Sequence, residues 1–147
     1  MASGGTIRIK VCSAELTRDT EMFGKMDPYC VIEYKDKKYQ TNVKNEAGTK
    51  PVWNQSFNFF AELNRLIVFD VLEEDTFSSD QVGRVETTVE AIIPKNGADS
   101  VEHNLELNYG NEEAGTLKIS VEFTPAPQWF TFILADFWNL RGFGVLG

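Results

Sequence analysis

The chain has 147 residues and a formal net charge of −8 at pH 7, and 42% of its residues are apolar. This length fits one domain with an appendage, and the apolar fraction is sufficient for a packed core. The acidity argues against a nucleic-acid-binding protein, whose surface is usually basic. It is compatible with a membrane partner, because a bound cation can reverse the charge of an acidic site.

Segments of alternating apolar and polar residues predict about eight short strands. The first strand covers residues 6–12, and the second begins at Cys30 after a long polar loop. Turn signals such as Asp36-Lys37 and Gly48 separate the later segments. These segments lie around Tyr39, Thr41 and Val43, then at 57–59, 66–72, 85–89, 101–107 and 117–123. The pattern predicts an all-β fold, an antiparallel β-sandwich.

Two acidic loops adjoin these strands. The first precedes the second strand, and the other directly follows the apolar segment 66–72. If consecutive strands run antiparallel, the loops at 13–27, 44–53 and 73–81 share one end of the sandwich. Carboxylate oxygens are the usual ligands of calcium, which takes about six to eight of them. The loops therefore predict one shared cation site, with Asp19, Glu21, Asp27, Glu73, Asp75 and Asp80 as ligands.

Three motifs resemble the C2 domain family. They are Gly-Lys-Met-Asp-Pro-Tyr at 24–29, Pro-Val-Trp-Asn-Gln-Ser-Phe at 51–57, and the acidic loop that ends at Gly83. They occur in the order of the family and close to its spacing. The resemblance implies an eight-stranded sandwich that binds phospholipid. One strand precedes the first acidic loop and an extra strand closes the chain, so the connectivity looks like the permuted type II form.

The family's calcium ligands are mostly aspartates, and the resemblance carries them over to Asp27, Asp75 and Asp80. Glu21 and Glu73 stand where the family usually has aspartate. The spacing back from Gly83 is one residue short, so the match of the second loop presumes a deletion near Gln81. The alternative is a solvated acidic loop that binds no metal at physiological calcium, and the residues leave both interpretations open.

Apolar residues occupy the predicted tips of both loops. Met22 and Phe23 lie in the first loop, and Phe77 lies in the second. Beside a calcium site they are expected to insert into a bilayer; the alternative is that they pack on each other and close the loops. Lys35, Lys37 and Lys38 form a small basic cluster, which we interpret as a solvated hairpin tip.

The composition changes abruptly after residue 124, so we expect a domain over 1–124 and an aromatic tail over 125–147. As a helix, its apolar stretch 129–140 would be about 18 Å long, too short to cross a hydrocarbon core of about 30 Å. So aromatic a segment is expected to bury itself against its own domain, a membrane interface or a partner. The expected partner-anchor residues are Trp129, Phe130, Phe132, Ile133, Phe137, Trp138 and Leu140.

The sequence thus predicts a non-enzymatic domain that docks on anionic phospholipid membranes with calcium. The alternative is an accessory subunit of a membrane protein complex, with a degenerate domain as scaffold and the tail as anchor. The single His103 has no identifiable nucleophile or orienting partner, which argues against an enzyme. The first residues contain no signal or transit-peptide pattern, and Cys12 and Cys30 are expected to be reduced core thiols. We therefore expect a cytoplasmic, peripheral membrane location, or else an organellar membrane complex.

Overall fold

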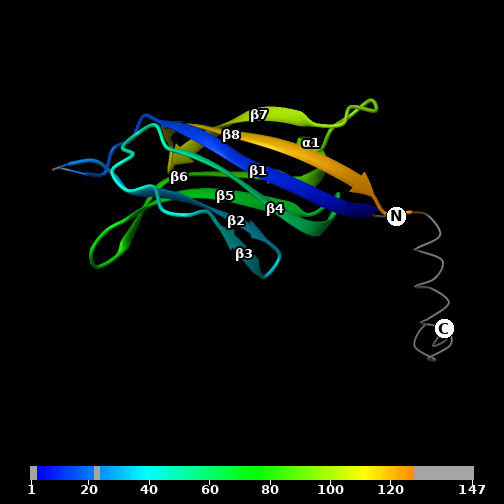
Figure 1. Ribbon diagram of the computed structural model, residues 1–147, viewed down its shortest axis with the longest axis horizontal. Helices are drawn as coiled ribbons and strands as arrows, with labels where there is room; N and C mark the ends of the chain where they lie inside the picture. Colours follow the sequence, from blue (N-terminus) through cyan, green and yellow to red (C-terminus); the bar gives the residue numbers. More distant parts are fainter. Residues whose placement is uncertain (1–2, 22–23, 128–147) are drawn as a thin grey trace.

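The computed structural model describes residues 3–21 and 24–127 (Figure 1). Its eight antiparallel strands confirm the predicted all-β sandwich. The strands are β1 (Gly4–Leu16), β2 (Pro28–Tyr34), β3 (Lys37–Gln40), β4 (Val52–Glu62), β5 (Leu66–Glu74), β6 (Ser79–Thr88), β7 (Val101–Tyr109) and β8 (Glu112–Pro125), with one short helix, α1 (Val89–Ile92).

The strands follow one another in the order β3-β2-β5-β6-β7-β8-β1-β4. Between β6 and β7 the pairing is reduced to Arg84 opposite Asn108, so the sheet bends there into two layers of four strands. Alternate residues of β1, beginning at Ile7, and of β5, beginning at Ile67, are fully buried. This alternation is what the pleat of a strand imposes, and it places the core between the layers.

The last strand lies beside the first. Gly5 of β1 pairs with Pro125 of β8, and the pairing continues to Leu16 opposite Gly115. On its other side β1 pairs with β4. This arrangement fits the permuted connectivity that the sequence suggested, in which one strand precedes the first acidic loop and an eighth strand closes the sandwich.

Two segments differ from the predicted strands. β3 ends at Gln40, before the predicted strand residue Thr41. The hydroxyl of the buried Thr41 accepts a hydrogen bond from the Cys30 amide at 2.9 Å and donates one to the Asn42 carbonyl at 3.1 Å. Val89 begins α1 and does not extend β6. The Thr88 hydroxyl caps this helix by accepting from the Ala91 amide at 3.3 Å. In both places a threonine hydroxyl competes with strand pairing for the backbone.

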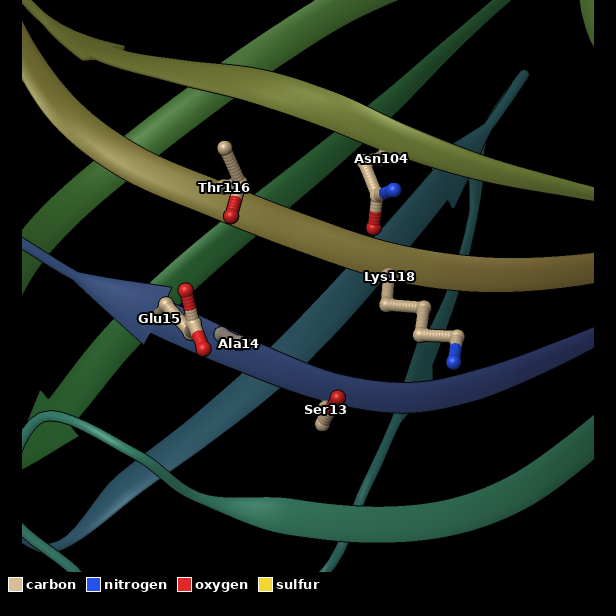
Figure 2. Close-up of a pocket in the computed structure, with 6 residues that line it drawn as sticks. All are labelled: Ser13, Ala14, Glu15, Asn104, Thr116 and Lys118. Atoms are coloured by element: carbon tan, nitrogen blue, oxygen red, sulfur yellow. The ribbon is translucent and has the colours of Figure 1, made fainter.

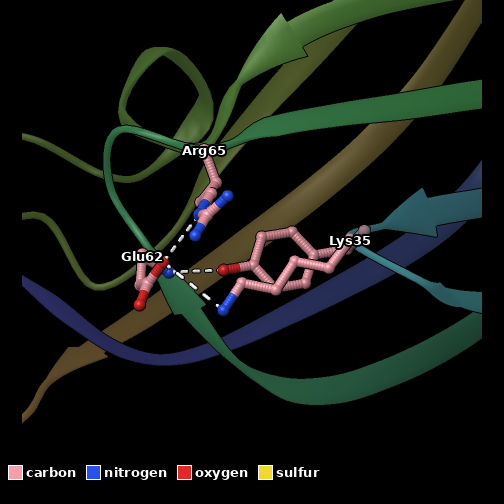
Figure 3. A network of polar contacts seen from close by, with 4 residues as sticks. Lys35, Glu62 and Arg65 are labelled. Carbon is pink, nitrogen blue, oxygen red and sulfur yellow. Dashed lines mark hydrogen bonds and ion pairs between the residues drawn. The ribbon is translucent and has the colours of Figure 1, made fainter.

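A polar network fixes the end of the sandwich opposite the acidic loops (Figure 3). The Glu62 amide donates to the Tyr34 hydroxyl at 2.8 Å, and the Glu62 carboxylate binds Arg65 at 2.8 Å and Lys35 at 3.4 Å. These contacts join the β2–β3 turn to the β4–β5 turn. The Ala126 amide also donates to the Gly4 carbonyl at this end, where the N-terminus and the exit from β8 lie together.

Candidate functional site

Three loops meet at the other end of the sandwich, as the antiparallel order of the strands predicted. The Gly48 amide of the β3–β4 loop donates to the Met26 carbonyl of the β1–β2 loop at 3.0 Å. The Glu74 amide, where β5 enters the second acidic loop, donates to the Asp27 carbonyl at 3.0 Å. Backbone hydrogen bonds therefore hold the two acidic loops against each other.

Two of the three sequence motifs, at 24–29 and 51–57, are in direct contact at this end. The Trp53 indole N–H donates to the Pro28 carbonyl at 3.2 Å, and the Lys44 amide donates to the same oxygen at 3.0 Å. Met26 is fully buried, and its sulfur accepts from the Thr20 amide at 3.5 Å. The motif at 51–57 therefore packs against the motif at 24–29. This contact helps to position Asp27 at the end of the sheet.

Glu73 is the buried acidic residue of this end of the sandwich. Its side chain is only 1% exposed, and its Oε1 atom has no hydrogen-bond partner among the described residues. Glu73 lies opposite Pro28 on β2 and opposite Asp80 on β6. Burial raises the pKa of Glu73 to about 7, with further contributions from a hydrogen bond to Glu21 and from the negative charges of Glu21, Asp75 and Asp80. In the absence of a cation, the fold therefore favours the protonated form of Glu73.

The remaining predicted ligands are partly engaged with backbone amides. Asp27 Oδ1 accepts from the Glu46 amide at 2.6 Å, and Asp19 Oδ1 accepts from the Glu21 amide at 3.0 Å. Asp75 Oδ1 accepts from the Thr76 amide at 2.7 Å. Each of these carboxylates keeps its second oxygen for another contact. The fold thus brings Glu21, Asp75 and Asp80 around Glu73, while one oxygen each of Asp19, Asp27 and Asp75 stabilises its loop.

The donor set fits a hard divalent cation. The predicted ligands are all carboxylates, which is the chemistry that calcium prefers. The buried Oε1 atom of Glu73, which has no hydrogen-bond partner, is costly without a cation. Within residues 3–21 and 24–127, no three acidic, histidine or cysteine side chains converge as a ready-made metal-binding group. Ligation by this set therefore requires the exposed loop side chains to turn toward Glu73, and the six ligands stay a prediction.

Of the predicted membrane-contact residues, the structure describes Phe77. Its side chain is 97% exposed at the tip of the β5–β6 loop, so it does not pack back to close the loop. Met22, Phe23 and the partner-anchor residues of the tail lie outside the described residues. In the part of the chain that the structure describes, no helix has the length and apolar character needed to cross a membrane.

A contact that the sequence analysis did not single out supports the first acidic loop. The Arg18 guanidinium lies 3.7 Å from the centre of the Tyr109 ring, and the neighbouring Thr17 amide donates to the Ala114 carbonyl at 2.9 Å. The β7–β8 hairpin therefore braces the loop that carries Asp19 and Glu21. An arginine before an acidic loop was visible in the sequence, but its distant aromatic partner was not.

Two surface hollows outside the acidic loops carry no reactive arrangement. The first, about 360 Å³, lies over β1, β8 and β7, and Figure 2 shows Ser13, Glu15, Asn104, Thr116 and Lys118 around it with no acid–base pair poised on a hydroxyl. The second, about 280 Å³, lies over β2, β3 and β5. Its single lysine, Lys38, is paired with Glu33 at 3.6 Å, and Asp70 is buried beside it. This setting agrees with a solvated basic hairpin and disfavours an anionic headgroup.

The chain is similar in sequence to known plant proteins. Synaptotagmin-5 of Arabidopsis thaliana is 38% identical over 93 residues, which cover 60% of this chain and only 16% of that protein. Elicitor-responsive protein 3 of Oryza sativa subsp. japonica is 25% identical over 123 residues, covering 82% of this chain and 84% of the relative. The chain is thus of similar length to the second relative and matches a small part of the first.

Solved structures agree on the fold. The C2A domain of plant Extended Synaptotagmin 1 superposes with a TM-score of 0.73 at 21% identity, over 84% of this chain and 97% of that domain. A C2 domain-containing protein from a putative elicitor-responsive gene gives 0.69 at 21% identity, over 87% and 95% of the two chains. The profile of the C2 domain matches residues 5–107. With two interacting motifs, the sandwich and this match in agreement, the chain belongs to the C2 domain family.

Proposed function

We propose that this protein docks on anionic phospholipid membranes through its two acidic loops, with calcium bound between the loops and the lipid. The observation that carries the proposal is Glu73, a buried carboxylate whose Oε1 atom has no partner and whose neighbours are three more carboxylates. A site built in this way favours a divalent cation, because the cation relieves both the desolvation and the mutual repulsion of the carboxylates.

Calcium would be held by Glu21, Glu73, Asp75 and Asp80, with Asp19 and Asp27 contributing the oxygens that are free of backbone contacts. When bound, the ion supplies positive charge at the loop end of a protein whose net charge is −8. The local field is then reversed, which allows phosphate groups to approach. The membership of the C2 family and the likeness to a calcium-bound C2A–C2B structure of Extended Synaptotagmin 2, with a TM-score of 0.67, support this role.

Phe77 would add an apolar contact. It projects almost fully into solvent next to Asp75, so a loop that reaches the headgroups also brings this ring to the acyl chains. Complete burial of such a side chain contributes about 1.5–3 kcal/mol. Met22 and Phe23 are proposed to act in the same way from the first loop. The protein would then be a peripheral membrane protein without enzymatic activity.

The test is sedimentation with vesicles of phosphatidylserine and phosphatidylcholine, with calcium or with chelator. We expect binding only when calcium and the anionic lipid are both present. Phe77→Ala is expected to weaken vesicle binding about tenfold and to leave calcium affinity unchanged. Leu66→Ala is the matched control, because Leu66 is also an exposed apolar residue, at 56%, but begins β5 at the opposite end of the sandwich.

Calorimetry separates the metal from the lipid. Glu73→Gln is expected to abolish the heat of calcium binding, and Glu74→Gln, its exposed neighbour, is expected to keep it. If the wild-type protein takes up no calcium and binds no anionic vesicles, the docking function is wrong, and the scaffold alternative that the sequence raised takes its place.

A further inference from the structure

Two apolar hollows flank the point where the described chain ends, at the end of the sandwich opposite the acidic loops. The first has a volume of about 230 Å³ and is lined by Gly5, Thr6, Phe60 and residues 124–127. The second, about 450 Å³, is lined by Leu63, Ile93, Pro94 and Phe123 among others, and it shares Pro125 and Ala126 with the first. One short stretch of chain therefore forms a wall of both hollows.

Phe60 makes the first hollow an exposed apolar surface. It lies on the outward face of β4, and its large apolar side chain is 52% exposed. Phe60 adjoins Pro125, Ala126 and Pro127 around the first hollow, and a contiguous apolar surface usually marks a site that something else covers. The proposed membrane contact does not cover it, because the acidic loops lie at the other end of the sandwich.

The chain itself supplies an apolar segment at this place. Residues 128–147 follow Pro127, which lines the first hollow, and Trp129, Phe130 and Phe132 come within five residues of it. Five residues span at most about 18 Å even when fully extended. The hollows are therefore within reach of the first aromatic residues of the tail. A tether this short gives an effective concentration in the millimolar range, well above that of any free partner.

We propose that the aromatic residues at 129–132 bind back into these two hollows of their own chain, so that the beginning of the tail is a cover for the end of the sandwich. An aromatic side chain buries about 150–250 Å² of surface, so one or two rings suffice to fill hollows of this size. Binding would remove both Phe60 and the bound aromatic rings from contact with water. The inference is independent of calcium and of lipid.

Amide NMR spectra of the full chain at low concentration, in chelator and without vesicles, test the contact. The wild-type protein is compared with the triple variant Trp129→Ser, Phe130→Ser, Phe132→Ser. We expect shift changes at Gly5, Thr6, Leu63 and Ile93, which line the hollows but are remote in sequence from the substitutions. Changes restricted to residues adjacent to 129 would overturn the proposal. Shift changes that grow with protein concentration would also overturn it, in favour of a second copy.

A matched pair of substitutions on β4 provides the second test. Phe60→Asp places a charge in the first hollow, and Val52→Asp places one on the same face of the same strand at its other end, at a residue that is also exposed, at 55%. In a Trp138→Phe background, acrylamide quenching then reports on Trp129, since Trp53 is buried in the core. We expect a several-fold rise in quenching for Phe60→Asp and none for Val52→Asp. Equal quenching in both variants and in the parent would mean that the tail does not cover the hollow.

Discussion

Glu73 shows how a single residue can carry a site. The alternate residues Ile67, Phe69, Val71 and Glu73 of β5 all face inward and are buried, so the strand pattern that builds the core also places a carboxylate in it. Only the last of these positions lies close to the loops. Its burial was predictable from the alternation, whereas its contact with Glu21 depends on a loop conformation that no local pattern specifies.

Glu73 is expected to make stability depend on pH. Its folded-state pKa is raised from 4.5 to about 7, so the folded protein binds a proton that the unfolded chain releases. Without calcium, the free energy of unfolding should therefore fall as the pH rises from about 4.5 to about 7. Glu73→Gln should remove this dependence and stabilise the protein by about 1–3 kcal/mol at pH 8. Thermal melts in chelator, with Glu74→Gln as the control, measure the effect. A steeper or unchanged pH profile would contradict it.

Thr41 is a second buried residue whose polar side chain stabilises the fold. Its hydroxyl satisfies the Cys30 amide where β3 has already ended. Thr41→Val keeps the shape but leaves that amide unpaired, so we expect a loss of about 1–3 kcal/mol in urea unfolding. Thr41→Ser keeps the hydroxyl and should lose only about 0.8 kcal/mol for the methyl group. If the two variants are equally stable, the hydrogen bond contributes nothing.

At the scale of elements, the strands and their common ends were largely predictable. Period-two alternation located the strands, and antiparallel order placed the loops at 13–27, 44–53 and 73–81 together, as the hydrogen bonds between them confirm. Helix α1 was not predicted, because Val85, Thr87 and Val89 continue an alternating pattern and only the cap at Thr88 ends it. Contacts between distant loops, such as the Glu46 amide with Asp27, leave no periodic signal in the sequence.

The β7–β8 hairpin is expected to control the mobility of the first acidic loop. Tyr109→Leu removes the ring beneath Arg18 and with it a cation–π contact of about 0.5–1 kcal/mol. Hydrogen exchange of the Thr17 amide, which donates to Ala114, should then speed up roughly two- to fivefold. Tyr109→Phe keeps the ring and should behave as the wild type. Unchanged exchange in Tyr109→Leu would show that the hairpin holds the loop without this contact.

At the scale of the whole molecule, the net charge opposes the approach of the protein to an anionic membrane. A protein with net charge −8 is repelled by an anionic surface, and the loop end is where we propose that a cation changes that. The start of β1 and the exit from β8 lie at the far end, so the long axis of the sandwich separates the proposed membrane contact from the point where the described chain ends.

The proposed calcium bridge predicts a specific dependence on salt. In saturating calcium, vesicle binding should weaken as sodium chloride rises from 0.1 M to 1 M, because the screening length falls from about 10 Å to about 3 Å. In chelator, binding should be absent at every salt concentration. Sedimentation across the salt series measures this, and binding that persists unchanged at 1 M would indicate an apolar attachment in place of a calcium bridge.

The pairing of β1 with β8 also constrains how the protein is made. Gly5 and Pro125 are partners although they lie 120 positions apart in the sequence. Contacts this distant in sequence must wait for the loop between them to close, which slows folding. During synthesis, β1 leaves the ribosome first and β8 last, so one edge of the N-terminal strand lacks its partner until nearly the whole domain has emerged. The domain is therefore expected to complete its fold only after β8 has emerged, and a chain interrupted within β8 would expose the edge of β1 to aggregation.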